Sequence, residues 1–300
     1  MSTVSSSRRT RARGLNRITV STVLIGCFMV FLCLVIIIPL LNLVAKSFCE
    51  PLLVSRMTGY QIWPEKFSTV HYQVIMRTDT IWRAVYNSLI VTLCGTALSV
   101  VLTCASAYAL TRPGLPGKKL LMGFFLAMMV LSAPILQWYL VMRGYKLINN
   151  HLSMILYGCV DVYNMILLMR FFEETPKAIL EAARVDGAGD WTLLFRIFIP
   201  LNKVPIITIM LFYIVPKWNE YFASGVFMPN VQVLQVYLRE FVVNSNSEAL
   251  SKDIYAMFRD LNMSALQNAT IVISIVPLLC LYPTILKYFT SGVLAGGVKE

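Results

Sequence analysis

The 300-residue chain is 57% hydrophobic and only 14% charged, with a mean hydropathy of +0.68. Charged residues make up about a quarter of an ordinary soluble domain, so the composition excludes that class and indicates an integral membrane protein. The net charge of +11 does not indicate nucleic-acid binding, because the basic residues are scattered between apolar runs and form no single polar face.

The first predicted element is an uncharged apolar run over 18–45, preceded by a basic arm over 1–17. At a rise of about 1.5 Å per residue, the run is long enough to cross a hydrocarbon core of about 30 Å. It is also longer than the apolar part of a signal peptide, about 7 to 15 residues. We therefore predict an uncleaved first transmembrane helix, followed by an extracytoplasmic loop over 46–83.

Five more apolar runs follow, and together they form a predicted five-helix core over 84–290. Hydrocarbon satisfies no backbone polar group, and the runs are continuous rather than alternating, so they predict helices and not a β-barrel. The predicted fold class is an all-α polytopic membrane protein with six transmembrane helices. The five runs cover 84–111, 120–142, 152–169, 204–227 and 267–286.

Lysine and arginine placement predicts the orientation. The arm over 1–17 and the segments after the second and fourth runs are rich in basic residues, whereas the alternate segments hold fewer. By the positive-inside rule, both termini are cytoplasmic, including a tail over 291–300. The segment over 173–200, between the fourth and fifth runs, is then cytoplasmic too.

This cytoplasmic segment predicts a short helix, a bend and a second helix outside the bilayer. Thr175 is a candidate N-cap and Pro176 suits the first helical position, while Gly187 ends the helix and Asp190 is a candidate cap for the second one. The alternative is a solvated connector.

The spacing within this segment resembles a family motif. Glu-Ala-Ala, three residues, Gly187, nine residues and Ile-x-Ile-Pro matches the EAA motif of ATP-binding-cassette (ABC) importer permeases, EAA-x3-G-x9-I-x-L-P, with Ile199 in place of leucine. "WNEYF" and "NSLIVTLCGTALSVVLTCASAYALTRPGLPGKKLL" are similar to the carbohydrate-uptake branch, whose members include the shorter permease of the maltose importer. "NMILLMRFF" and the ending "YPTILKYFTSGVLAGGVKE" look closest to the complex-oligosaccharide subgroup. The resemblance covers 87–300.

The resemblance implies a type I ABC importer permease fold in a bacterial cell membrane. It also implies these partners: a second, larger permease subunit, two ATPase subunits, an extracellular or periplasmic solute-binding protein, membrane lipid and a sugar or oligosaccharide substrate. This chain would bind no cofactor, because ATP and Mg²⁺ belong to the ATPases. In agreement, the sequence lacks the phosphate-binding pattern G-x-x-x-x-G-K-[ST], and it contains no constellation of metal-ligating or catalytic residues.

In this family the EAA helix docks in a cleft of the ATPase. The resemblance therefore implies a coupling role for Glu181, Ala182, Ala183, Asp186 and Gly187. Small alanines allow close approach, the two carboxylates offer charge partners, and glycine permits the bend. The alternative for each residue is an ordinary helix surface or C-cap.

Polar residues inside the apolar runs predict a substrate pathway. A mid-bilayer aspartate costs about 2.5 to 3.5 kcal/mol, so Asp161, midway in the fourth run, needs a partner or a use. Asn164 lies one helical turn on. Both are predicted to line a sugar path; the alternative is a structural hydrogen bond to a neighbouring helix.

The fifth run contains a second polar group, "PKWNEYF", in which Pro216 predicts a kink. We predict that Trp218, Asn219 and Glu220 belong to the pathway; the alternative is a buried ion pair between Lys217 and Glu220. Two other functions remain open at this stage: a permease of the same fold for amino acids or peptides, and a secondary transporter that needs no ATPase.

Overall fold

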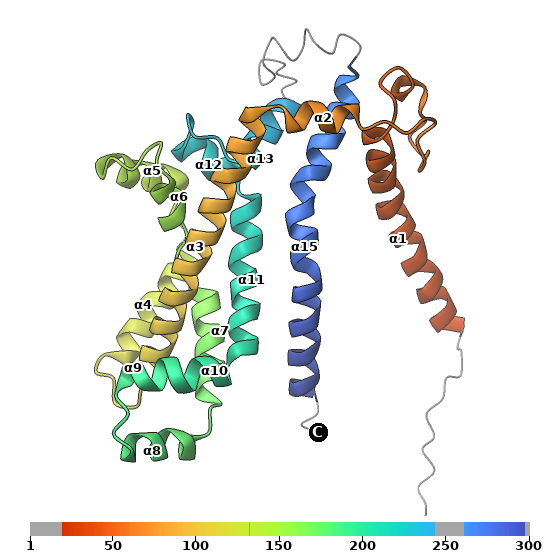
Figure 1. Cartoon of the computed structure of the whole chain (residues 1–300). Coiled ribbons are helices and arrows are strands. Elements are labelled where there is room, and N and C mark those ends of the chain that lie inside the picture. Colours follow the sequence, from red (N-terminus) through yellow and green to blue (C-terminus); the bar gives the residue numbers. More distant parts are fainter. Residues whose placement is uncertain (1–19, 132, 244–260, 298–300) are drawn as a thin grey trace, which may run out of the picture.

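The computed structural model describes residues 20–131, 133–243 and 261–297. The predicted basic arm over 1–17 and residues 298–300 of the predicted tail lie outside these ranges. Four long helices run between the two ends of the molecule: α1 (Val20–Ser47), α3 (Asp79–Thr111), α11 (Lys203–Asn219) and α15 (Met263–Gly297) (Figure 1). We name the ends after the short helices that lie there, the α2 end and the α8 end.

The remaining described elements are shorter helices, and the predicted all-helical class is confirmed. They are η1 (Val54–Arg56), α2 (Val70–Met76), α4 (Lys118–Val130), α5 (Ile135–Gly144), α6 (His151–Leu156), α7 (Val162–Glu173), α8 (Lys177–Val185), α9 (Asp190–Thr192), π-helical η2 (Leu193–Phe198), α10 (Ile199–Leu201), α12 (Phe222–Phe227), α13 (Leu234–Leu238) and π-helical η3 (Arg239–Val243).

Between three and five candidate membrane spans are present among the described residues. The helices α1, α3 and the first part of α15 are each long and apolar enough. Two bent pairs also qualify if each is one span. The helices α4 and α5 meet at 113°, and the stretch Asp190–Leu201 meets α11 at 86°.

Three of the six predicted runs are each divided into two helices. The run over 120–142 breaks before Pro134, whose ring disfavours helical geometry in the preceding residue. The run over 152–169 breaks at Gly158, which takes a φ of +60°. The run over 204–227 breaks at Glu220, between α11 and α12. The helix α7 has 12 residues and rises only about 18 Å, so it spans a membrane only together with the chain before it.

Small residues let the central helices pack closely. The face of α3 that is buried against α7 and α11 carries mostly serine, threonine, glycine and alanine. In a membrane, helices associate by close van der Waals packing and by hydrogen bonds rather than by the hydrophobic effect, which favours such a face. Thr103 shows both contributions, since its hydroxyl is buried and lies 2.8 Å from the Tyr213 hydroxyl on α11.

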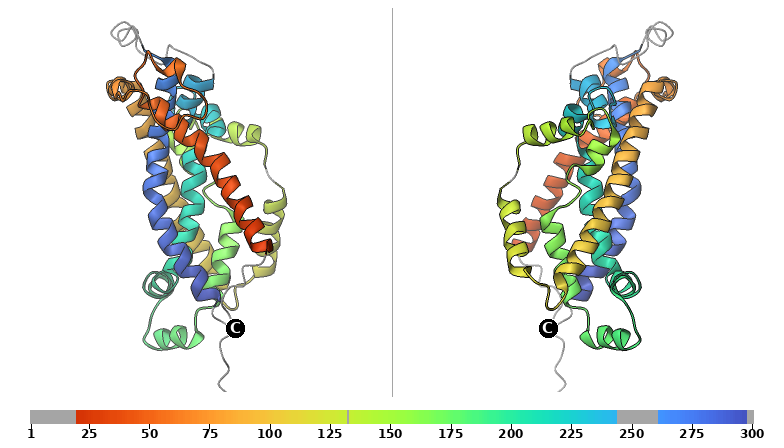
Figure 2. Two further views of the ribbon diagram at one scale, coloured as in Figure 1. Left: turned by 90° about the vertical axis from the view of Figure 1, so that its right-hand side faces the viewer. Right: turned by 90° about the vertical axis from the view of Figure 1, so that its left-hand side faces the viewer.

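The first helix stands apart from this core. Nearly all of α1 is exposed, and it packs against α15 near the α2 end (Figures 1 and 2). There the Asn42 side chain donates hydrogen bonds to the carbonyls of Thr58, at 2.9 Å, and Gln61, at 2.6 Å. These bonds tie the loop after α1 to its last turns.

Candidate functional site

The segment with the EAA motif forms α8 and lies at one end of the molecule (Figure 1). Pro176 precedes the helix in an extended conformation. Thr175 is not the side-chain cap that the sequence predicted. Its buried hydroxyl instead accepts a hydrogen bond from Asn202 Nδ2 at 3.2 Å, because the chain returns there to start α11.

The predicted bend after α8 is confirmed at Gly187. Its φ is +80°, a conformation that residues with a Cβ rarely adopt. The Gly187 amide donates to the Arg184 carbonyl at 3.0 Å, and the Ala188 amide donates to the Ala183 carbonyl at 2.9 Å. No atom lies within 4 Å of where a Cβ would stand, so glycine is needed here for its backbone and not for space.

The helix α8 has one face on the protein and one face free. Leu180 and Ala183 pack on the core formed by α3, α7 and η2. Glu181, Ala182 and Asp186 are exposed, and Val185 keeps 88% of its surface exposed. Of the five predicted coupling residues, Ala183 therefore faces the protein's own core, whereas Gly187 shapes the bend and the other three lie on the free surface.

Asp190 holds the second part of the segment against α3. The sequence predicted that Asp190 caps this second helix. It is instead the first residue of α9, and Gly189 occupies the N-cap position. The Asp190 carboxylate forms an ion pair with Arg112 and accepts a hydrogen bond from the Tyr108 hydroxyl at 3.2 Å. The Arg112 guanidinium also lies over the Tyr108 ring, 4.9 Å from its centre. Sequence reasoning missed this cluster, since 82 residues separate Tyr108 from Asp190.

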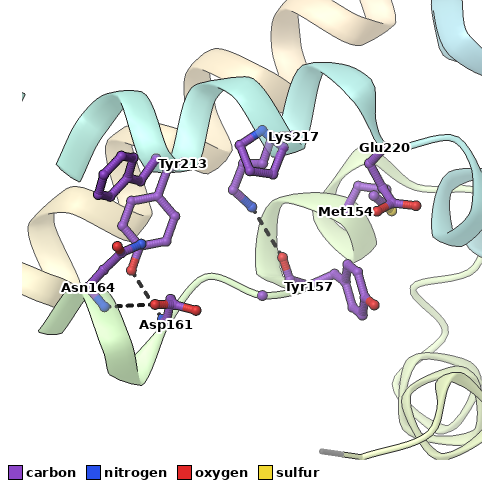
Figure 3. A pocket seen from close by; sticks show the side chains of 10 residues that line it. Met154, Tyr157, Asp161, Asn164, Tyr213, Lys217 and Glu220 are labelled. Atoms are coloured by element: carbon purple, nitrogen blue, oxygen red, sulfur yellow. Dashed lines mark hydrogen bonds between the residues drawn. The ribbon is translucent and has the colours of Figure 1, made fainter. Parts of the chain in front are cut away.

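A second candidate site is a cavity of about 170 Å³ between α6, α7 and α11 (Figure 3). The structure brings together three of the five predicted pathway residues, Asp161, Asn164 and Glu220, in its wall. Polar atoms of other side chains also reach it. The full lining is Met154, Tyr157, Gly158, Asp161, Asn164, Phe212, Tyr213, Pro216, Lys217 and Glu220.

The sequence predicted that Asp161 lies in the middle of a helix. It is instead the N-cap of α7. Its backbone is extended, and its Oδ1 accepts a hydrogen bond from the backbone N–H of Asn164 at 2.7 Å (Figure 3). Its own amide donates to the Tyr213 hydroxyl at 3.1 Å. The break at Gly158 places the N-terminal end of α7 at the cavity. Tyr213 was missed because no polar neighbour marks it in the sequence.

Lys217 and Glu220 do not form the alternative ion pair. The Lys217 ammonium donates to the Tyr157 carbonyl at 3.1 Å (Figure 3). A Glu220 oxygen instead accepts from the Ala223 amide at 2.8 Å. The helix breaks at Glu220, so its carboxylate bonds to the first turn of α12 and does not keep the helical spacing from Lys217. Gly95 on α3 makes room for the lysine, because a Cβ there would lie 3.1 Å from Lys217 Cδ.

The other two predicted pathway residues lie outside the cavity wall. Trp218 is 4% exposed, and its indole N–H donates to the Ser274 carbonyl on α15 at 3.3 Å. Asn219 is exposed and bonds to the Val215 carbonyl of its own helix at 2.9 Å. Trp218 thus joins α11 to α15, while Asn219 lies on an open surface.

Known proteins share this sequence and fold. The chain is 31% identical over 279 residues to the polygalacturonan/rhamnogalacturonan transport system permease protein YtcP of Bacillus subtilis. The aligned region covers 92% of this chain and 97% of YtcP. The chain is 27% identical over 248 residues to the diacetylchitobiose uptake system permease protein DasC of Streptomyces coelicolor, covering 79% and 83%. A chain of a bacterial ABC transporter involved in the import of the acidic polysaccharide alginate superposes with a TM-score of 0.79 at 27% identity, covering 90% and 95%. No family model matches the chain.

A helical membrane fold with an exposed EAA helix at one end and a polar cavity between its helices is that of a transport permease. The chain belongs to the permease subunits of binding-protein-dependent ABC importers for sugars and oligosaccharides. It is a multi-pass protein of the bacterial membrane that transports rather than catalyses, and subunits of this kind carry no cofactor.

Proposed function

We propose that the chain crosses the membrane six times with both termini in the cytoplasm. The crossings would be α1, α3, α4, α7, α11 and α15, with the broken helices completed by the irregular chain beside them. The basic residues support this orientation, since the ends of α3, α4 and α11 that carry Arg112, Lys118 and Lys203 all lie at the α8 end (Figure 1). The α8 end then faces the cytoplasm, and residues 46–83 lie outside.

In this orientation α8 is the coupling helix. One observation supports the role most: the helix is fixed to the core by Leu180 and Ala183 while Glu181, Ala182 and Asp186 remain uncovered. The free face matches a partner that brings basic groups and a close-fitting surface. ATP-driven movement of that partner would turn the attached helices as rigid bodies and alternate the access of the substrate pathway.

The partners would be two ATPase subunits at the α8 end, a second, larger permease subunit alongside, and a solute-binding protein at the α2 end. The exposed length of α1 supports a neighbour in the membrane. The relatives support a carbohydrate substrate, and the names of YtcP and of the alginate transporter indicate acidic polysaccharides for those two proteins. Asp161, Asn164 and Glu220, which line the cavity, and the exposed Asn219 would contact the sugar during its passage.

Purification of the tagged chain from its native membranes in mild detergent tests this assembly. We expect two ATPase copies and one larger permease per chain, and sugar-stimulated ATP hydrolysis after the solute-binding protein is added. Recovery of a chain that transports sugar in proteoliposomes with no ATPase present would contradict the proposal. The test variant is Glu181→Lys, which should reduce the amount of ATPase recovered with the chain and leave membrane insertion unchanged.

A further inference from the structure

We propose that a groove at the α2 end, which we call the Arg239 groove, binds a sugar unit that bears a carboxylate. The groove holds about 370 Å³ and lies between the start of α12, the α13–η3 stretch and α15. Its polar side chains are Tyr221, Gln235 and Arg239, and its apolar wall includes Leu238 and Ile271. The proposal rests on the sugar-permease function and adds the class of sugar and the residues that select it.

Arg239 supplies a cation that no carboxylate pairs within 20–131, 133–243 and 261–297, the part of the chain that the structure describes. Its sequence neighbour Glu240 is engaged elsewhere, since the Gln232 amide donates to it at 2.6 Å. Among the described residues that line the Arg239 groove, none is acidic. A guanidinium in this setting attracts an anion from outside, and its planar fork fits a carboxylate with two parallel hydrogen bonds.

Tyr221 both orients the arginine and offers a surface for a sugar ring. The guanidinium carbon lies over the Tyr221 ring, 5.3 Å from its centre, a cation–π contact that uses the charge of the arginine rather than a hydrogen bond. The tyrosine stands at the break between α11 and α12 and is 45% exposed. An apolar face of a pyranose packs well on such a ring. The Gln235 amide adds a donor and an acceptor for hydroxyl groups.

The combination fits a uronic acid better than a neutral sugar or a phosphate. A neutral sugar would cover the guanidinium without pairing it, and a buried cation without a partner is costly. A phosphate carries more charge than Arg239, the one cation among the described lining residues, can balance. One guanidinium beside one aromatic ring and one amide matches one carboxylate on one sugar ring. The position near Asn219 and Glu220 places this unit beside the proposed pathway.

A matched pair of probes tests the proposal: labelled trigalacturonate and the same trisaccharide after its carboxyl groups are reduced to alcohols. Equilibrium binding is measured on the complete complex of permeases and ATPases without the solute-binding protein. We expect the wild type to bind the acidic probe at least about tenfold more tightly. Arg239→Gln should remove that preference and leave binding of the reduced probe unchanged, and Arg239→Lys should keep part of it. Tyr221→Ala should weaken both probes, whereas Tyr221→Phe should weaken neither.

The control is Arg56→Gln, which removes an exposed cation of the same end outside the groove and should alter neither probe. The proposal is overturned if the wild type binds both probes equally, or if Arg239→Gln changes both probes equally or neither. A complex that imports only neutral sugars would overturn this proposal and leave the sugar-permease function intact. An assembled complex that moves no sugar at all would count against the function itself.

Discussion

Arg112, the residue after α3, is ion-paired with Asp190, the first residue of α9, which follows the bend after α8. Tyr108 donates to the same carboxylate, so the last turn of α3 is bonded to the start of α9. The proposed coupling helix α8 is thereby attached twice, through the core contacts of Leu180 within it and through Asp190 beyond its C-terminal end. A push on α8 then has a direct route into α3, the helix that packs on both α7 and α11.

The first prediction concerns this link. Asp190→Asn or Arg112→Gln should lower sugar-stimulated ATPase activity by about fivefold or more, since coupling energies between sites are usually about 1 to 3 kcal/mol. Assembly with the ATPase should be unchanged. The exchange Arg112→Asp with Asp190→Arg should recover part of the activity, because it restores the ion pair. No recovery together with normal assembly would mean that the pair does not carry the coupling.

The second prediction concerns the bend at Gly187. Gly187→Ala places a Cβ on a residue with a φ of +80°, which costs about 1 to 2 kcal/mol and favours a different bend. We expect slower sugar uptake with an unchanged amount of inserted protein, measured in membrane vesicles. Gly123→Ala is the matched control, because Gly123 lies within α4 and has no atom within 4 Å of its Cβ position. Equal uptake by both variants would remove the special role of the bend.

The third prediction concerns the contact of Lys217 with Gly95. Lys217→Met leaves the Tyr157 carbonyl without its donor and should destabilise the protein by about 1 to 3 kcal/mol. Gly95→Ala should push the lysine away and cause part of the same loss. The double variant should therefore lose less than the sum of the two, as measured by thermal unfolding in detergent. Strict additivity would show that Gly95 acts independently of the lysine.

The fourth prediction separates two roles of Asp161. Asp161→Asn keeps an oxygen that can accept from the Asn164 amide, so the cap of α7 and the stability should persist. If the carboxylate contacts sugar, this variant should still change the rate or the selectivity of transport. Asp161→Ala should also lose about 1 kcal/mol of stability, because the cap is gone. Wild-type transport by Asp161→Asn would leave the residue with a structural role alone.

Particular residues show how far the sequence predicts this protein. The helical class, the EAA segment and the bend at Gly187 follow from local features, namely continuous apolar runs, a fixed spacing and a glycine. Residue type marks the breaks beside Pro134 and Gly158, but a glutamate does not mark the break at Glu220, and the apolar runs around all three conceal the interruption. Predictions that assumed one continuous helix were therefore wrong at these points, including the prediction that Asp161 lies in the middle of a helix.

What the sequence by itself determined is the membrane class, the family and the position of the EAA segment that we propose as the coupling site, because these depend on composition and on spacing along the chain. Only the tertiary structure decided the partners of the polar side chains. Lys217 bonds to a carbonyl 60 residues away, and Trp218 bonds to one 56 residues away. In a medium that offers no hydrogen bonds, a polar side chain takes whatever partner the packing of the helices brings near, and no local pattern encodes that choice.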